Sequence, residues 1–309
     1  MMRYKSRPLL LFGAHGRLGA AIAQAAGQAG RSVSCITWAE AKPWRHLDDP
    51  TVIVKRFTQA SESTEVDVLF ANGLTDPARP VDELGYSNCE LPLKIIEAMR
   101  EAKGMRFLTF GTVMEEFAQH ADTKRYLASK CALASGIETL AADPLYSHRL
   151  VHLRLHTLYG AEPAAHSFLG QICGSLQRNE SFLMSSGWQL REFHHVRDVA
   201  SSVLALCGRP WDSLTPDVLS FGRPVQLRGL AETVFADFDL SDLLKVGQLT
   251  TPSGENFEKV IPRSPEWLIA REREPMKGVI DWLAEFIGCG TTSRSDQFEA
   301  LCREYRLSA

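Results

Sequence analysis

The sequence has no long hydrophobic run, no excess of basic residues and no closely spaced pair of cysteines. A membrane-spanning helix needs about 20 consecutive apolar residues, so we expect no membrane segment. The formal net charge of -3 argues against a nucleic-acid partner, because no basic excess is present to neutralise phosphates. The first apolar run, Leu9–Phe12, is too short for a secretory signal peptide.

The seven cysteines are scattered, and none belongs to a Cys-x-x-Cys pair. They therefore predict reduced thiols in a cytoplasmic protein, and no metal site is expected. A length of 309 residues with 45% hydrophobic residues is sufficient for one large α/β domain or two smaller ones.

The most informative stretch is a glycine-rich turn near the start of the chain. Four apolar residues, Leu9–Phe12, lead into Gly13, and Gly16 and Gly19 follow at a spacing of three. Strong helix formers come next, so the pattern predicts a buried strand, a tight turn and a helix. An ordinary strand–helix turn would also fit, but this context favours a turn that holds the pyrophosphate of a dinucleotide at a helix N-terminus.

Further strands and helices alternate along the chain. We expect strands at 32–37, 66–72 and 105–110, and helices near 48–57, 88–103 and 126–142. The carboxyl ends of parallel strands meet at one edge of a sheet, so Ala71, Asn72 and Gly73 should line the cofactor site, with Gly111 and Thr112 beside them.

A Tyr-x-x-x-Lys pair lies in the last of these helices. Tyr126 and Lys130 are four residues apart and so share a helix face. An ammonium beside a phenol lowers its pKa, and such a tyrosine can exchange a proton with a hydroxyl or ketone near neutral pH. Two unrelated surface residues would give the same spacing.

The glycine turn, the threonine that follows a later strand, and Tyr-x-x-x-Lys form an ordered set that resembles the short-chain dehydrogenases/reductases. The segments 153–160 and 187–200 narrow the resemblance to the extended branch, the NAD(P)-dependent epimerase/dehydratase family, which acts mostly on nucleotide-linked sugars. The resemblance covers about residues 9 to 285. It implies a Rossmann-type doubly wound parallel sheet with a small C-terminal α/β part that binds substrate.

The resemblance also implies roles for individual residues. Tyr126 would be the catalytic acid/base, Lys130 would hold the nicotinamide ribose, and Thr112 would bond the reacting sugar oxygen. Substrate would contact Thr112, Thr157, Arg191 and Arg263, with Arg191 facing the pyrophosphate unless it pairs with Glu192. The residues expected around NADP or NAD are Gly13, His15, Gly16, Arg17, Leu18, Gly19, Thr37, Ala71, Asn72, Gly73, Tyr126 and Lys130.

Departures from the family pattern bear on cofactor and reaction. No acid stands at Thr37, so Arg17, Lys42 and Arg45 are candidates for a 2′-phosphate, and we expect NADP(H) to bind at least as well as NAD(H). The dehydratases' Asp-Glu pair is missing directly after Thr112, and Glu115 and Glu116 come one step too late to match it, which argues against dehydration. The missing acid slightly favours a 4-keto-sugar reductase over a 4-epimerase with tightly bound NAD. A reductase of a non-sugar ketone and a non-catalytic NADP sensor remain as alternatives.

The chain is expected to divide into a nucleotide-binding domain at 8–162, a mainly substrate-binding part at 163–285 and a helical tail at 286–309. His194 and His195 should pack or bond to backbone, and Asp198 should cap the helix 199–206. A homodimer is expected through the helices at 88–103 and 124–142, with Cys131, Leu133 and Ala134 contributing to the interface.

Overall fold

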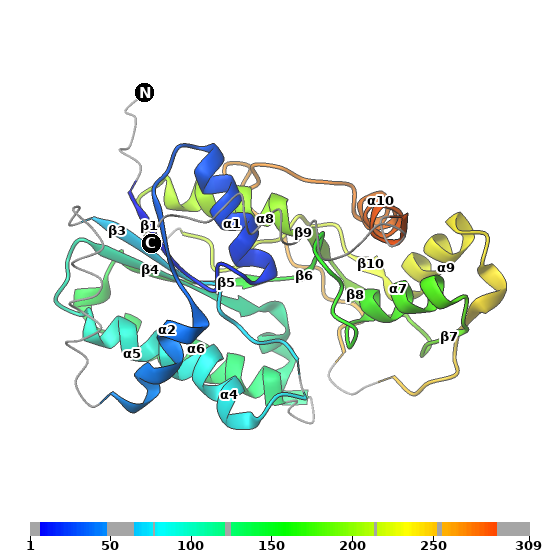
Figure 1. Ribbon diagram of the computed structural model, residues 1–309, viewed down its shortest axis with the longest axis horizontal. Coiled ribbons are helices and arrows are strands. Elements are labelled where there is room, and N and C mark those ends of the chain that lie inside the picture. Colours follow the sequence, from blue (N-terminus) through cyan, green and yellow to red (C-terminus); the bar gives the residue numbers. More distant parts are fainter. Residues whose placement is uncertain are drawn as a thin grey trace.

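The computed structural model describes residues 7–47, 65–76, 78–120, 125–212, 215–251 and 255–288. Its centre is a five-stranded parallel sheet in the order β2-β1-β3-β4-β5 (Figure 1). The strands are β1 Leu9–Phe12, β2 Val33–Ile36, β3 Val66–Phe70, β4 Met105–Thr112 and β5 Leu150–Leu155. The predicted Rossmann-type sheet is confirmed, and β4 is longer than expected because Gly111 and Thr112 still belong to it.

Both faces of this sheet are covered by helices. The side chains of β1 alternate, so that Leu9 and Leu11 pack with α1 (Arg17–Gln28) and α8 (Val196–Cys207). Leu10 and Phe12 pack on the other side with α5 (Leu91–Ala98) and α6 (Arg125–Ala141). A strand that is buried on both faces consists of consecutive apolar residues, and β1 could therefore be predicted from the sequence.

The bounds predicted for the helix at 88–103 are wrong at both ends. Helical backbone begins with α4 (Val81–Gly85), passes through a π-helical turn at Tyr86–Glu90 and ends with α5 at Ala98. Pro92 has no N–H to donate to the preceding turn, and a π turn tolerates that gap. The early end follows from Arg149, whose guanidinium bonds the carbonyls of Met99, Arg100 and Ala102.

Smaller elements form a second cluster beside the sheet (Figure 1). Short strands pair there as β6 with β9, β8 with β10 and β7 with β11. The strands are β6 Thr157–Tyr159, β7 Phe182–Leu183, β8 Leu190–Arg191, β9 Phe193–His195, β10 Val225–Gln226 and β11 Leu244–Lys245. The helices are α7 Phe168–Arg178, α9 Leu227–Asp237 and α10 Pro275–Gly288. The remaining helical segments are α2 Trp38–Ala41 and the 3-10 turns Lys42–His46, Val113–His120, Pro144–Tyr146 and Ser241–Leu243.

The prediction that Asp198 caps a helix is wrong. Helix α8 begins at Val196, and its N-cap is His195, whose Nδ1 accepts the Arg197 N–H at 3.1 Å. Burial lowers the pKa of His195 to about 4, so the ring is neutral and can accept this bond. Asp198 lies inside the first turn, 1% exposed, and pairs with Arg273.

The helix expected near 48–57 and residues 289–309 of the expected helical tail lie outside the described residues. Among the helices that are described, none is long and apolar enough to cross a membrane. The described cysteines are Cys35, Cys89, Cys131, Cys173 and Cys207, and all of them are free thiols.

Candidate active site

The turn after β1 is packed too closely for any side chain. Gly13 has a φ of +77°, and a Cβ there would lie 2.5 Å from the carbonyl oxygen of Ala71. A Cβ at Gly19 would lie 2.0 Å from the carbonyl oxygen of Gly13. Strand β1, the loop after β3 and helix α1 therefore meet through their backbones, and α1 presents its N-terminal N–H groups at this point. This cradle fits the pyrophosphate of a dinucleotide.

The loop after β3 forms the other wall of this crevice, because the sheet order reverses between β1 and β3. Asn88, which is 1% exposed, bonds both backbone groups of Leu74 and the hydroxyl of Ser129 on α6. Ser87 donates to the carbonyl of Asn72 at 2.7 Å. The π-helical turn thus fixes the loop of Ala71, Asn72 and Gly73.

An acid does lie at the end of β2, contrary to the sequence-based expectation. Thr37 caps α2, and the carboxylate of Glu40 folds back to accept the Thr37 N–H at 2.9 Å and its hydroxyl at 3.0 Å. In the sequence Glu40 is the first acid after this strand, three residues beyond Thr37, and a capping box brings its carboxylate back to the end of β2. Lys42 and Arg45 pair with Glu83 and Asp82, at 3.9 and 3.0 Å.

Arg17 also lies elsewhere than expected. Its side chain points from α1 toward the loop after β3, where Nη2 lies 3.4 Å from the hydroxyl of Thr75. It lines a cavity with Thr157, and its charge acts on Tyr126. Since β2 lies on the opposite side of β1, Arg17 faces away from Thr37, and the sequence-based reason for preferring NADP(H) fails.

The three proposed catalytic residues come from β4 and α6. Thr112 ends β4, and its Oγ1 accepts the Met114 N–H at 3.3 Å, which leaves the hydroxyl proton for another acceptor. Lys130 is 6% exposed and donates to the carbonyl of Phe110 at 2.8 Å. A Cβ at Gly73 would lie 3.0 Å from Lys130 Nζ, so the ammonium faces the predicted cofactor loop.

The expected lowering of the Tyr126 pKa is wrong for this structure. Burial and the charge of Glu115 raise the pKa of Tyr126 to about 12, against an opposing effect of Arg17. Burial also lowers the pKa of Lys130 to about 8. The tyrosine is therefore a phenol at neutral pH. The charge of Glu115 has the largest charge effect on both groups, and the sequence did not indicate this effect.

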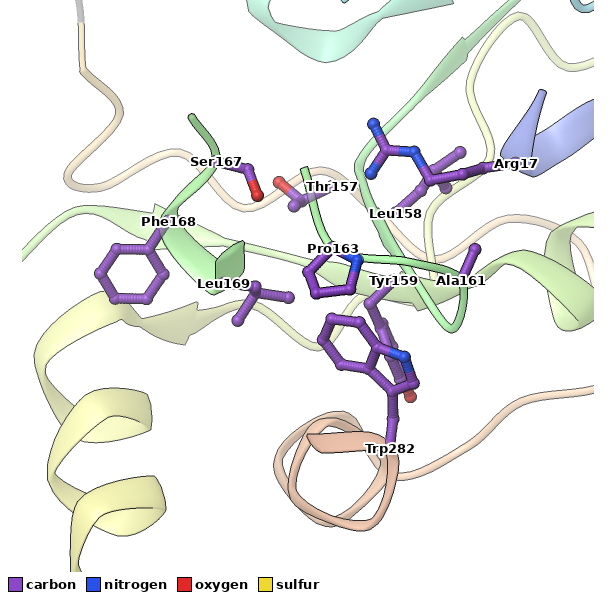
Figure 2. A pocket seen from close by; sticks show the side chains of 10 residues that line it. All are labelled: Arg17, Thr157, Leu158, Tyr159, Ala161, Pro163, Ser167, Phe168, Leu169 and Trp282. Atoms are coloured by element: carbon purple, nitrogen blue, oxygen red, sulfur yellow. The ribbon is translucent and has the colours of Figure 1, made fainter. Parts of the chain in front are cut away.

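Figure 2 shows a first cavity, between the N-terminal residue of α1 and the second cluster. Arg17 and Thr157 point into it with Ser167, over an apolar floor that includes Tyr159 and Trp282. Thr157 opens β6, and its backbone N–H donates to the carbonyl of Glu192 at 3.1 Å. The cavity therefore combines one charged group and two hydroxyls with apolar and aromatic side chains.

The second cavity begins directly after Thr112. Its lining includes Val113, Met114, His156, Arg191 and Lys259. Burial lowers the pKa of His156 to about 4, and its buried Nε2 has no hydrogen-bond partner among the described residues. His156 was not singled out from the sequence, although it lies in the segment 153–160 that carried the resemblance.

Arg191 has an unexpected acidic partner. It pairs with Glu255 and not with Glu192. Glu192 is 2% exposed and instead accepts bonds from His194, Ser220 and the Phe221 N–H, each at 2.9 Å.

Arg263 lines neither of these two cavities. It bonds Glu272 at 2.8 Å, Glu266 at 3.0 Å and the carbonyl of Phe221 at 2.9 Å. Its role as a phosphate contact stays a prediction.

A glycine turn therefore lies at the switch point of a Rossmann-type parallel sheet, and Thr112 ends the neighbouring strand β4. The model of the NAD dependent epimerase/dehydratase family matches residues 9–222 of the chain. The chain belongs to this family of NAD-dependent enzymes, as the sequence motifs indicated.

Solved structures share the fold at low sequence identity. The NAD-dependent NDP-hexosamine 5,6-dehydratase TunA of tunicamycin biosynthesis has a TM-score of 0.67 and 18% identity, covering 90% of this chain and 98% of its own. The UDP-N-acetylglucosamine 4-epimerase from Methanobrevibacter ruminantium M1 has a TM-score of 0.69 and 14% identity, covering 92% and 99%. The UDP-glucose 4-epimerase from Thermus thermophilus, solved with NAD, has a TM-score of 0.64 and 16% identity, covering 91% and 99%. No curated protein matches the chain in sequence.

Proposed function

We propose that this protein transfers hydride between NAD(H) and a nucleotide-linked sugar, and that it acts as a reductase of a 4-keto sugar. The observation that carries the proposal is the set of Thr112, Tyr126 and Lys130, placed at the sheet edge where the glycine turn also lies. Family membership supports the cofactor and the sugar class.

Each residue has a definite task in this reaction. The Thr112 hydroxyl donates to the sugar carbonyl oxygen, since its acceptor side is already used by the Met114 N–H. Tyr126 gives its phenolic proton to that oxygen as the carbonyl becomes a hydroxyl. Lys130 holds the nicotinamide ribose from its place beside Gly73. When bound, the reduced nicotinamide supplies the hydride that completes the reduction.

The state of Tyr126 favours reduction over oxidation. A reductase needs a proton donor at the start of its reaction, and Tyr126 is a phenol at neutral pH because desolvation and the charge of Glu115 raise its pKa. Dehydration fits less well. The Glu115 carboxylate already accepts the Thr112 N–H at 2.8 Å and lies 3.2 Å from Nε2 of His152, so it does not replace the dehydratases' missing Asp-Glu pair.

A 4-epimerase is the second candidate, and one observation favours it. Glu40 places a carboxylate at the end of β2, where an acid holds the ribose hydroxyls of NAD. We therefore expect NAD(H) rather than NADP(H). An epimerase benefits from keeping its NAD bound throughout the cycle.

On the substrate side, Arg191 is the candidate for the pyrophosphate, because a guanidinium suits paired phosphate oxygens. It lines the second cavity with its side chain 16% exposed, and Glu255 occupies its guanidinium. A diphosphate at this place has to share or displace Glu255. We thus expect the affinity for a nucleotide sugar to fall in Arg191→Ala.

We also propose a cytoplasmic homodimer that uses α5 and α6, which lie side by side. Leu133 cannot contribute to this interface because it is 2% exposed in the protein's own core. Cys131 and Ala134 are partly exposed. Sedimentation at micromolar concentration tests the dimer, and a mass near that of one chain would contradict it.

The decisive experiment begins with the spectrum of the purified, dialysed protein and extraction of any bound nucleotide. A reductase should contain no stoichiometric NAD after purification and dialysis. It should oxidise added NADH only when a nucleotide-linked 4-keto sugar is present. NAD that survives dialysis in stoichiometric amount, together with interconversion of two 4-epimeric nucleotide sugars, would establish the epimerase instead.

A further inference from the structure

One wall of the second cavity is formed by residues 255–261, which we call the strap. Asn256 attaches the strap to β8, because its carbonyl oxygen accepts the Leu190 N–H at 2.7 Å. The Asn256 side chain closes a turn, since it accepts the Lys259 N–H at 2.8 Å and donates to the Lys259 carbonyl at 2.7 Å. Asn256, Lys259 and Ile261 line the cavity. The strap is thus a folded segment at the place where we expect the diphosphate of the substrate.

The first side chain of the strap holds Arg191. Glu255 forms an ion pair with this guanidinium, and the two side chains are largely buried, with exposed fractions of 12% and 16%. Arg191 is the only ion-pair partner of Glu255 in the described part of the chain. The guanidinium also donates from Nη1 to the Leu190 carbonyl at 2.8 Å, which is a bond within β8. The acid therefore occupies part of the group that a diphosphate would need.

A second cation of the strap lines the same cavity. Lys259 pairs with Glu116 in the 3-10 turn that follows Thr112, and its Nζ lies 5.8 Å from the centre of the Phe117 ring. Glu116 has a further partner, because Nη1 of Arg154 lies 2.6 Å from its other carboxylate oxygen. Glu116 would therefore keep a counter-ion if Lys259 turned toward a ligand. The Lys259 side chain is 53% exposed, so little packing holds it in place.

The charges around the second cavity are balanced in the protein itself. Arg191 and Lys259 are its two cationic lining residues, and each pairs with an acid. Glu192 in the same lining is 2% exposed, and its bonds to three neighbouring groups keep it from either cation. A ligand with two phosphates has to take the place of an acid, and Glu255 is the acid whose one partner is Arg191.

We propose that the strap supplies an exchangeable counter-ion for the diphosphate of the substrate. Glu255 leaves Arg191 when the diphosphate binds, and Lys259 turns from Glu116 to the second phosphate. This inference rests on the proposed function, in which Arg191 holds the diphosphate. A sugar without phosphates offers Arg191 no charge in return for Glu255, so the exchange restricts the site to diphosphate-linked sugars.

Titration with nucleoside diphosphates tests the exchange without the reaction. Calorimetric titration with UDP, dTDP and GDP, in saturating NADH that fills the glycine turn, measures the affinity at the second cavity. Glu255→Gln keeps the size of the side chain and removes its charge. The affinity should rise about tenfold if Arg191 is free in roughly one molecule in ten, because an occupied site lowers the apparent affinity by that fraction. Glu258→Gln removes an exposed acid from the same strap and should leave the affinity unchanged.

Two further comparisons assign the effect to named groups. In an Arg191→Ala background Glu255→Gln should have no effect on the affinity, because the exchange needs the guanidinium. Lys259→Met should weaken diphosphate binding by about threefold, the size expected for an exposed ion pair. Lys277→Met removes another exposed lysine that pairs with an acid, on α10, and should not weaken it.

Equal affinities in Glu255→Gln and Glu258→Gln, or a weaker one in Glu255→Gln, would overturn the inference. An unchanged affinity in Lys259→Met would overturn the part assigned to the lysine. Glu255→Ala removes the same charge and decides the question if Glu255→Gln does not fold. Tighter diphosphate binding by Glu255→Gln in a protein that reduces no nucleotide-linked sugar would support the exchange and refute the proposed function. Reduction of such a sugar, with a diphosphate affinity that Glu255→Gln does not change, would do the reverse.

Discussion

Replacing Gly19 with alanine should damage both the fold and the nucleotide site. The added Cβ would lie 2.0 Å from the carbonyl oxygen of Gly13, 2.7 Å from its carbonyl carbon and 3.0 Å from Cα of Ala14. All three are backbone atoms of the turn itself, so no flexible side chain can move aside. Helix α1 would have to shift away from β1, and its N-terminal N–H groups would move with it.

The size of the effect follows from overpacking, which costs about 1–3 kcal/mol. For a chain of this length, each kcal/mol corresponds to roughly 2–4 °C in Tm. Because the shift also misplaces the donors expected to hold a pyrophosphate, we expect NADH affinity to fall by at least about tenfold, or about 1.4 kcal/mol. Thermal melts by circular dichroism and fluorescence titration with NADH measure the two effects.

The same helix offers a matched control. Gly27 lies near the end of α1, and a Cβ there would meet nothing within 4 Å. Gly27→Ala makes the same chemical change where space is available and should raise stability slightly, by at most about 1 kcal/mol. The steric reasoning is refuted if Gly19→Ala melts and binds NADH as the wild type does, or if both variants behave alike.

The nucleotide-binding half was predictable because its signals are local. A strand buried on both faces requires consecutive apolar residues, and the turn after it requires glycines where backbones touch. Leu9–Phe12 and Gly13, Gly16 and Gly19 carry both signals within eleven residues. The structure that these residues form depends on contacts between residues close in sequence, so the strand and its cofactor turn could be predicted from the sequence.

The hydrogen-bond and ion-pair partners of individual side chains were not predictable, because they depend on residues that only the fold brings together. Asp198 has a good N-cap side chain, but Arg273, 75 residues further on, pairs with it inside the helix. His195 takes the cap because burial keeps its ring neutral. Likewise, Arg191 meets Glu255, 64 residues away, instead of its neighbour Glu192.

The direction in which a side chain points could not be predicted from the sequence either. Glu115 was rejected as a dehydratase acid because it comes too late after Thr112, and that comparison considered only sequence position. The backbone turns at Val113–His120, so the carboxylate returns beneath the strand that precedes it. The carboxylate lies in the space that a side chain at Gly111 would take, beside His152.

Three further variants test the site. Tyr126→Phe should keep NADH affinity and lose at least about two orders of magnitude in turnover, the usual contribution of a positioned acid, and near wild-type rates would remove Tyr126 from the mechanism. Glu40→Gln should weaken the binding of NADH relative to that of NADPH in parallel titrations. An unchanged ratio of the two affinities would show that Glu40 does not hold the ribose. Arg17→Met should raise the pKa of Tyr126, because Arg17 is the cation that lowers it. A phenol that is a weaker acid donates its proton less readily, so turnover should fall while the alkaline limb of the pH profile moves upward. NMR titration of protein labelled at tyrosine Cζ measures the pKa of Tyr126, and Tyr126→Phe assigns its signal. Arg178→Met, which removes an exposed arginine from α7, is the control and should leave that pKa in place. A Tyr126 pKa that stays constant in Arg17→Met would refute the effect of this guanidinium on the phenol.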